Sequence, residues 1–325
     1  MESPPVPGPD TLQRWLLDMA VIRRVEELAQ GAYQQRKIRG FLHLYIGQEA
    51  VAVGSHAALR KDDVVVTAYR DHGIALARGV SARAVMAELY GRSTGVCKGL
   101  GGSMHMASAE HHIYGGYGIV GGHVPLGAGA ALAFQYRGES RISLTFFGDG
   151  ASNQGAFFEA LALAQLWKLP AIFVCENNRY AMGTSVERSS YLTDMSRRGD
   201  GVGMVRWQFE AYDPVVVYEN IAKAAEHARS GAGPVILDAQ CYRYRGHSMS
   251  DPGKYRSAEE VAEYRKRDPL LLTADRLLAA GVSQERIDAI LAEADAIATE
   301  SVSFADASPE PEARELYDHT YVEGT

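Results

Sequence analysis

Two periods of hydrophobic and polar positions alternate along the chain, one typical of buried strands and the other of helices. Apolar runs predict five short strands, at residues 64–68, 141–147, 170–176, 204–212 and 234–240. Helical spacing predicts helices at residues 11–36, 48–59, 81–90, 124–136, 153–167, 217–229 and 257–301. This alternation of strands and helices indicates an α/β protein with a doubly wound, mostly parallel sheet.

Two of the predicted helices are apolar around most of their circumference. Helix 124–136 is built from small residues, including Gly127 and Gly129, whereas helix 153–167 carries aromatic residues and leucines. A helix of this kind is expected to be buried on most sides. We therefore expect helix 124–136 at a helix–helix contact, within the chain or between subunits. Helix 153–167 is expected to cover a parallel sheet that is covered on both faces.

The sequence further divides into an arm, a core and a helical end. Residues 1–10 are rich in proline and predict a flexible arm, and residues 11–325 predict a single domain. The core of this domain is predicted over about 40–250, and a helical C-terminal region over 257–325. Residues 91–122 are rich in glycine, and an ordered loop of this length is usually functional.

Composition narrows the class of partner. The 325 residues include 33 basic and 40 acidic side chains, and the net charge of −7 argues against nucleic acid or an anionic membrane as a partner. No segment approaches the roughly 20 apolar residues of a membrane span, and the first residues lack the basic and apolar regions of a secretory signal. The three cysteines are far apart and form no metal-binding spacing, so we expect reduced thiols in a cytoplasmic protein.

The most informative chemistry lies at the ends of two predicted strands. Gly148-Asp149-Gly150 follows strand 141–147, and Asn177-Asn178 follows strand 170–176. Strand, helix and strand form a βαβ crossover, which brings the carboxyl ends of both strands to one edge of the sheet. Asp149 and Asn178 should then lie side by side and offer the hard oxygen ligands that Mg²⁺ and Ca²⁺ bind.

The spacing of these motifs, with 26 residues between Gly150 and Asn177, is the signature of thiamine diphosphate sites. A lone Gly-Asp-Gly would fit a structural turn equally well. Six segments also occur in the order found in one enzyme family: 39–50, 69–73, 98–105, 118–121, 176–185 and 242–252. Together they resemble the alpha subunits of the thiamine-dependent decarboxylase component of 2-oxoacid dehydrogenase complexes, over nearly the whole chain. Segment 244–256 is most similar to family members that act on pyruvate.

The resemblance implies a thiamine diphosphate-binding fold of the diphosphate-binding type and assigns a role to each matching residue. Three residues would bind Mg²⁺: Asp149 and Asn178 through their side chains, and Tyr180 through its backbone carbonyl. The cofactor would contact Tyr69, Arg70, Gly150, Ala151 and His247 at the diphosphate, backbone groups of Gly118 and Val120 at the aminopyrimidine, and Met182 beneath the thiazolium. His43 and His247 would be catalytic, with His43 facing the substrate carboxylate or the reacting carbonyl.

Simpler interpretations of these residues stay open at the level of the sequence. Arg70 could form a surface ion pair, Met182 could be a core residue, and either catalytic histidine could be structural. By composition, residues 243–256 are only a solvated basic loop, whereas the resemblance implies that this loop orders over the cofactor and receives a lipoyl domain.

The resemblance also implies an activity and partners. The expected reaction is decarboxylation of pyruvate with thiamine diphosphate and Mg²⁺, followed by acetyl transfer to lipoamide on an acyltransferase component. In this family the glutamate that activates the cofactor lies on a separate beta chain. We therefore expect an α₂β₂ enzyme whose active site forms between subunits, and we interpret Glu49 as structural.

Three other functions compete with this interpretation. The first is a branched-chain 2-oxoacid or acetoin dehydrogenase of the same family. The second is a nucleotide-binding domain that uses residues 118–122 as a phosphate loop, although neither a preceding strand nor a P-loop lysine is predicted. The third is a scaffold subunit that takes no part in catalysis.

The chain departs from the family pattern at three places. Tyr117 and His123 replace other residues near the pyrimidine-binding stretch and bear on substrate preference. Residues 209–213 lack a usual glycine, which implies a different turn. In addition, a set of serines lies in segments that eukaryotic relatives phosphorylate, namely Ser185, Ser248 and Ser250.

Overall fold

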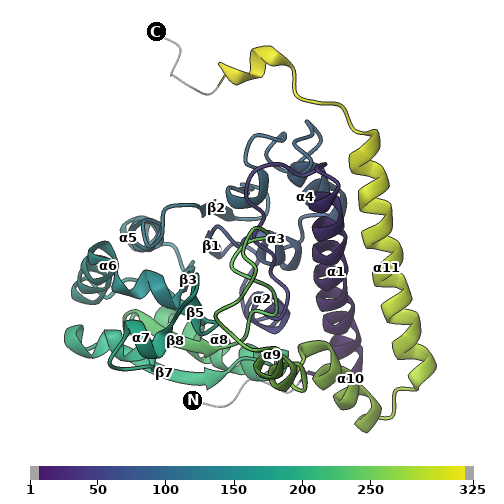
Figure 1. The fold of residues 1–325 in the computed structure, drawn as a ribbon. Helices are drawn as coiled ribbons and strands as arrows, with labels where there is room; N and C mark the ends of the chain where they lie inside the picture. The colour runs from purple at the N-terminus through teal and green to yellow at the C-terminus, as the bar shows by residue number, and fades with distance from the viewer. Residues whose placement is uncertain (1–6, 319–325) are drawn as a thin grey trace.

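The computed structural model describes residues 7–318 and contains a six-stranded sheet with helices on both faces (Figure 1). The strands are β1 (Val64–Ala68), β2 (Ile113–Tyr117), β3 (Ser143–Gly148), β4 (Ala171–Asn177), β7 (Val205–Glu210) and β8 (Val235–Gln240). Their order is β2-β1-β3-β4-β8-β7, and every neighbouring pair is parallel. A separate antiparallel hairpin pairs β5 (Tyr180–Ala181) with β6 (Thr184–Ser185). The predicted doubly wound parallel sheet is therefore confirmed.

The helices predicted at residues 11–229 are present with bounds that differ by a few residues, and α3 and α7 are additional. Those of the core are α1 (Pro9–Gln34), α2 (Glu49–Ala57), α3 (His72–Ala77), α4 (Ala82–Leu89), α5 (Val124–Arg137), α6 (Gly155–Leu166), α7 (Val186–Ser189) and α8 (Pro214–Arg229). The C-terminal region forms α9 (Ala258–Arg265), α10 (Pro269–Ala279) and α11 (Gln284–Ala307). Short 3₁₀ segments add η1 (Gly102–Met104), η2 (Asp149–Asn153), η3 (Met195–Val202) and η4 (Ala313–Leu316).

The structure changes the bounds of the predicted N-terminal arm and divides the predicted C-terminal helix. Helix α1 begins at Pro9, inside the stretch expected to be an arm, and residues 1–6 lie outside the described part of the chain. The predicted C-terminal helix is divided into three because Asp268 and Ser283 each cap a new helix start with a side-chain oxygen. None of the helices in the described residues is both long and apolar enough to cross a bilayer.

The core lies in two layers, one on each face of the sheet. Leu144 and Phe146 of β3 pack into a cluster with α1, α2 and α8. Phe147, the next residue along β3, points to the opposite face and packs on Phe157 of α6, with ring centroids 5.0 Å apart. Figure 1 shows the same division, with α5 and α6 on one side of the sheet and α1 and α2 on the other. This alternation is what a strand buried on both faces requires.

The order of the strands creates a switch point. From β1 the chain passes outward to β2 and then returns to the other side of β1 as β3. Segments that follow β1 and β3 therefore diverge from a common crevice at the carboxyl end of the sheet. In open α/β sheets this crevice is where ligands bind.

Helices α5 and α6 pack against each other, so helix 124–136 does lie at a helix–helix contact, while burial of its remaining sides by another subunit stays a prediction. Leu132 and Tyr136 of α5, and Phe158 and Leu166 of α6, are exposed. One face of each helix covers the sheet, and within residues 7–318 nothing lies over the other.

Several elements were not predicted, among them the short hairpin β5–β6, helix α7, strand β2 and helix α3. The glycine-rich region contains β2, an edge strand whose Gly115 and Gly116 hide the usual strand pattern. Helix α3 is only six residues long, which is too short to show a helical period.

Gly127 allows the close approach of α5 to the sheet. A Cβ atom at this position would lie 1.8 Å from the Thr145 side-chain oxygen of β3, whereas a Cβ at Gly129, on the same helix, would have no neighbour within 4 Å. We expect Gly127→Ala to lower the free energy of unfolding by about 1–2 kcal/mol, since overpacking outweighs the gain in helix propensity. The matched variant Gly129→Ala should raise it by about 0.5–1 kcal/mol. Urea denaturation of both proteins checks this, and equal changes of the same sign would contradict it.

Candidate functional site

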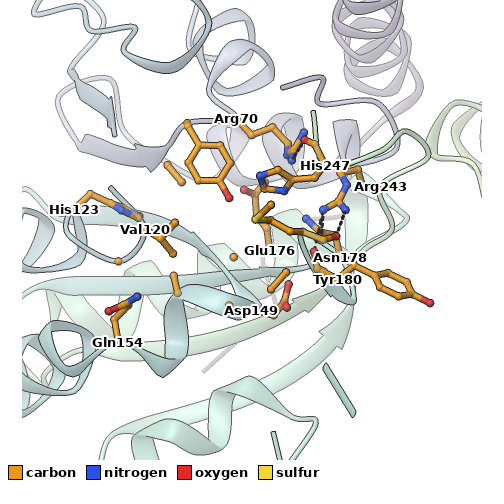
Figure 2. Close-up of a pocket in the computed structure, with 18 residues that line it drawn as sticks. Arg70, Val120, His123, Asp149, Gln154, Glu176, Asn178, Tyr180, Arg243 and His247 are labelled. Atoms are coloured by element: carbon orange, nitrogen blue, oxygen red, sulfur yellow. Dashed lines mark hydrogen bonds between the residues drawn. The ribbon is translucent and has the colours of Figure 1, made fainter. Parts of the chain in front are cut away.

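A cavity opens beyond the carboxyl ends of five strands (Figure 2). Each strand contributes lining residues from its carboxyl end or from the segment that follows it. They are Ala68, Tyr69 and Arg70 from β1; Val120, Gly121 and His123 from β2; Gly148, Asp149, Gly150, Ala151 and Gln154 from β3; Glu176, Asn178, Tyr180, Ala181 and Met182 from β4; and Arg243 and His247 from β8. The cavity thus occupies the switch point of the sheet.

A second cavity adjoins the first. It shares Tyr69, Val120, Met182 and His247 with the first cavity and adds His43, Gly118 and residues of the 241–257 loop. The twelve residues that the sequence analysis assigned to the site all line one or both of these cavities. Their roles in binding and catalysis stay predictions.

Three oxygen atoms beyond the carboxyl ends of β3 and β4 form a candidate ion site. The Oδ2 atom of Asp149 is buried and has no hydrogen-bond partner. The side-chain oxygen of Asn178 and the backbone oxygen of Tyr180 each accept a hydrogen bond of 3.0 Å from the guanidinium of Arg243. A cationic group therefore already lies on two of these oxygens, and the third lacks a partner, so the set suits a hard divalent cation such as Mg²⁺.

This candidate site depends on neutral oxygens as much as on charge. In the described part of the chain, no cluster of three or more histidine, cysteine, aspartate or glutamate side chains could hold a metal ion. Burial raises the pKa of Asp149 to about 6, while the positive charge of Arg243 lowers it. A bound cation would favour the carboxylate form in the same direction as Arg243.

Two arginines bring buried positive charge to the same cavity. Arg70 is only 6% exposed and donates to the backbone oxygens of Leu44 (2.7 Å) and His247 (2.9 Å). Burial, followed by the charge of Arg243, lowers the pKa of Arg70 to about 10, so Arg70 stays charged at neutral pH. Among residues 7–318, neither arginine has a carboxylate within salt-bridge distance, so the alternative of a surface ion pair for Arg70 is wrong. Buried cations without a counter-charge are costly, and a polyanion such as a diphosphate would neutralise them.

His43 and His247 lie together against Tyr69. The ring centroids of the two histidines are 5.1 Å apart, and that of Tyr69 lies 4.7 Å from His43 and 5.5 Å from His247. Burial, and then the positive charge of Arg70, lower the pKa of His247 to about 4 and that of His43 further. Both rings are therefore neutral at pH 7, and the Nδ1 atom of each is buried without a partner.

The hairpin β5–β6 presents Met182 to both cavities. Met182 has a positive φ of 52° and is 65% exposed, so the alternative that it is an ordinary core residue is wrong. Close approach explains two of the site glycines. A Cβ atom at Gly150 would lie 2.6 Å from that of Ala181, and one at Gly118 would lie 2.9 Å from the methyl group of Met104.

Sequence reasoning did not assign Glu176 or Arg243 to the site. Glu176 accepts hydrogen bonds from the hydroxyl of Tyr45 and, at 3.3 Å, from the amide of Gln48, and burial raises its pKa to about 7. Both missed residues lie at or just beyond the carboxyl end of a strand, Glu176 in β4 and Arg243 after β8. A search of the residues at and just beyond the carboxyl end of every predicted strand would have included both.

The structure also places the residues that depart from the family pattern, and Glu49. His123 lines the cavity and donates to the backbone oxygen of Phe146 at 2.7 Å, while the Tyr117 ring stacks parallel to it with centroids 6.3 Å apart. The turn at 209–213 needs no glycine, because none of these residues has a positive φ and Asp213 caps α8. Glu49 bonds to Arg23 at 2.6 Å and lies outside both cavities, in keeping with a structural role.

The structure changes one of the two arguments against a phosphate loop. Residues 118–122 do follow a strand, β2, and precede helix α5. The segment still contains no lysine, which a P-loop needs to reach the phosphates.

Comparison with known proteins shows which family the chain resembles. Residues 17–314 match the family described as dehydrogenase E1 component. The chain is 52% identical over 302 residues to the pyruvate dehydrogenase E1 component subunit alpha of Rhizobium meliloti, covering 92% of this chain and 87% of that protein. It is 48% identical over 326 residues to the human mitochondrial somatic form of that subunit, covering 98% and 83%. It is 46% identical over 328 residues to the Zymomonas mobilis subunit, covering 99% and 93%.

The neutral state of His247 can be tested by its titration. Because its folded-state pKa of about 4 lies below the ordinary 6.5, the unfolded chain binds a proton first as the pH falls. This histidine should therefore cost stability increasingly from pH 6.5 down to about 4. Replacing Arg70 by glutamine removes a positive charge and should raise the pKa of His247. Ring-proton NMR shifts against pH measure this, and a wild-type pKa near 6.5 or no change in R70Q would contradict it.

Proposed function

The chain belongs to the dehydrogenase E1 component family, and from this premise we propose that it is the alpha subunit of a thiamine diphosphate- and Mg²⁺-dependent pyruvate dehydrogenase. The reaction is the oxidative decarboxylation of pyruvate, with transfer of the acetyl group to lipoamide on an acyltransferase component. The names of the relatives support pyruvate over a branched-chain 2-oxoacid or acetoin.

One juxtaposition carries the proposal. An unpartnered carboxylate oxygen of Asp149 and two neutral oxygens of Asn178 and Tyr180 meet two buried arginines in one cavity. The oxygens suit a divalent cation, and the arginines suit a diphosphate. A metal-bound diphosphate satisfies both sets of groups at once, which neither a lone cation nor a lone anion would do.

The remaining residues are proposed to have separate binding and catalytic roles along the two cavities. Arg70 and Tyr69 would hold phosphate oxygens, and backbone groups of Gly118 and Val120 would bind the aminopyrimidine. Thiamine diphosphate, when bound, supplies the carbanion chemistry that decarboxylation needs. His43 and His247, as neutral imidazoles, can each offer one N–H to the carboxylate or carbonyl of pyruvate and one lone pair to accept a proton.

We further propose that a beta subunit completes the site in an α₂β₂ enzyme. Phe41 and Met182 line the second cavity and are 64% and 65% exposed, as expected for side chains that another chain covers. Of the three carboxylates in the cavities, Asp149 belongs to the ion site, and Glu176 is engaged by Tyr45 and Gln48. The third, Asp251, accepts hydrogen bonds from two backbone N–H groups of its own loop and from the hydroxyl of Tyr255. The carboxylate that activates the cofactor would therefore come from the partner chain.

The loop that spans residues 241–257 would receive the lipoyl group. Its Ser248, Ser250, Asp251 and Tyr255 line the second cavity, where the substrate enters in this proposal.

The three cysteine thiols are unpaired, which supports a reducing compartment such as the cytoplasm.

Removing the carboxylate of Asp149 tests the cofactor site. We expect Asp149→Asn to raise the dissociation constant for thiamine diphosphate with Mg²⁺ by at least about 100-fold, which corresponds to about 2.7 kcal/mol. Calorimetric titration of the complex with the beta subunit measures this constant. Asp288→Asn, on the exposed surface of α11, is the matched control and should leave it unchanged. Wild-type-like binding by the Asp149 variant would support a scaffold role instead.

Activity should require the partner chain. The purified chain alone should not turn over pyruvate, because it lacks the activating carboxylate, and addition of the beta subunit should restore turnover. Rates with pyruvate, 2-oxoisovalerate and acetoin then establish the substrate, with pyruvate expected to be the fastest. Robust turnover by the single chain would contradict the shared site, and a faster rate with either other substrate would contradict the assignment to pyruvate.

A further inference from the structure

The geometry points to Gln48 as a positioning residue that turns the side-chain oxygen of Asn178, rather than its NH₂ group, toward the candidate ion site. Gln48 lines neither cavity, and it acts on the candidate ion site only through its hydrogen bond with Asn178. The inference rests on the proposed function, because it concerns how this chain prepares one ligand for Mg²⁺.

A chain of directional hydrogen bonds begins at Glu176. Its Oε1 atom accepts from the hydroxyl of Tyr45 and from Nε2 of Gln48, at 3.3 Å. The NH₂ group of Gln48 is thereby directed toward Glu176, and its Oε1 atom is left to face Asn178. Nδ2 of Asn178 donates to that oxygen at 2.9 Å. The oxygen of Asn178 must then lie on the other side of the amide, which is the side of Arg243 and Tyr180 (Figure 2).

Orientation matters because the two ends of an amide differ in polarity but hardly in shape. An amide rotated by 180° would present N–H donors to a cation and lose a ligand. Since Gln48 is fully buried and Asn178 is 7% exposed, water offers little substitute for the lost partner. Residues that hold a metal ligand from behind typically change metal affinity by about 10- to 100-fold when they are replaced.

Gln48 is suited to this task by its own support. It precedes the first turn of α2, and its backbone oxygen accepts from Val51 at 2.9 Å. Helix α2 is packed in the core with α1 and α8. Arg243 also bonds to the Asn178 oxygen, but it lies in the 241–257 loop and uses the same atom that an ion would use. Gln48 acts on the nitrogen end, where nothing competes with it.

The test compares two substitutions in the complex with the beta subunit. Gln48→Met keeps the length of the side chain but removes both hydrogen bonds. We expect its dissociation constant for Mg²⁺, titrated as MgCl₂ with thiamine diphosphate present and followed by calorimetry, to rise by about 10- to 100-fold. Binding of thiamine diphosphate should recover at saturating Mg²⁺, which general damage to the fold would not allow.

The double variant Gln48→Glu with Glu176→Gln reverses the two groups. The new carboxylate at position 48 can accept from both the Asn178 amide and the new amide at position 176, so the orientation of Asn178 is kept. Its Mg²⁺ affinity should stay within about threefold of wild type, a smaller change than the loss of one hydrogen bond produces. This variant decides the question even if Gln48→Met does not fold, because a loss of tenfold or more would overturn the inference.

The outcomes separate this inference from the proposed function. A wild-type complex that binds thiamine diphosphate and Mg²⁺, together with a folded Gln48→Met variant of equal Mg²⁺ affinity, overturns only the role of Gln48. A wild-type complex that binds neither overturns the proposed function itself.

Discussion

The parallel register of β3 against β4 is the constraint on which the site depends. Gly148 lies opposite Glu176 in this register, so the residues that follow each strand begin at the same level of the sheet. A shift of one residue would turn Phe146 and Phe147 to the wrong faces, and both are fully buried against different helices. The packing that holds the fold therefore also holds Asp149 beside Asn178.

Burial then sets the chemistry of the groups gathered at that edge. It raises the pKa of Asp149 and Glu176 and lowers the pKa of His43 and His247, because in each case the charged form is the one that loses hydration. The arginines cannot lose their protons at neutral pH, so they keep positive charge in the cavity. The site thus combines neutral histidines, weakened carboxylic acids and fixed cations, an arrangement that favours a ligand carrying both an anion and its metal ion.

Much of the fold was predictable because its strands are buried on both faces. Such strands appear as continuous apolar runs, and β1, β3, β4 and β8 were found in this way. The edge strand β2 escaped because its glycines are placed for contact with Asp71 and not for a strand pattern: a Cβ at Gly116 would lie 1.9 Å from the Asp71 carboxylate. The exposed apolar faces of α5 and α6 are a different case. An apolar helix face indicates that another surface covers it, but it does not indicate whether that surface belongs to the same chain.

The sequence by itself determined the strand ends at which Asp149 and Asn178 stand and the motifs that identify the family, because local order and residue type carry both. Only the tertiary structure decided which side chains support them. Gln48 and Arg243 come from segments far apart in the sequence, and their hydrogen bonds to Asn178 depend on how the start of α2 and the 241–257 loop pack around the sheet. Hydrogen bonds of this kind are short-ranged and directional, so the periodicity of the sequence does not predict them.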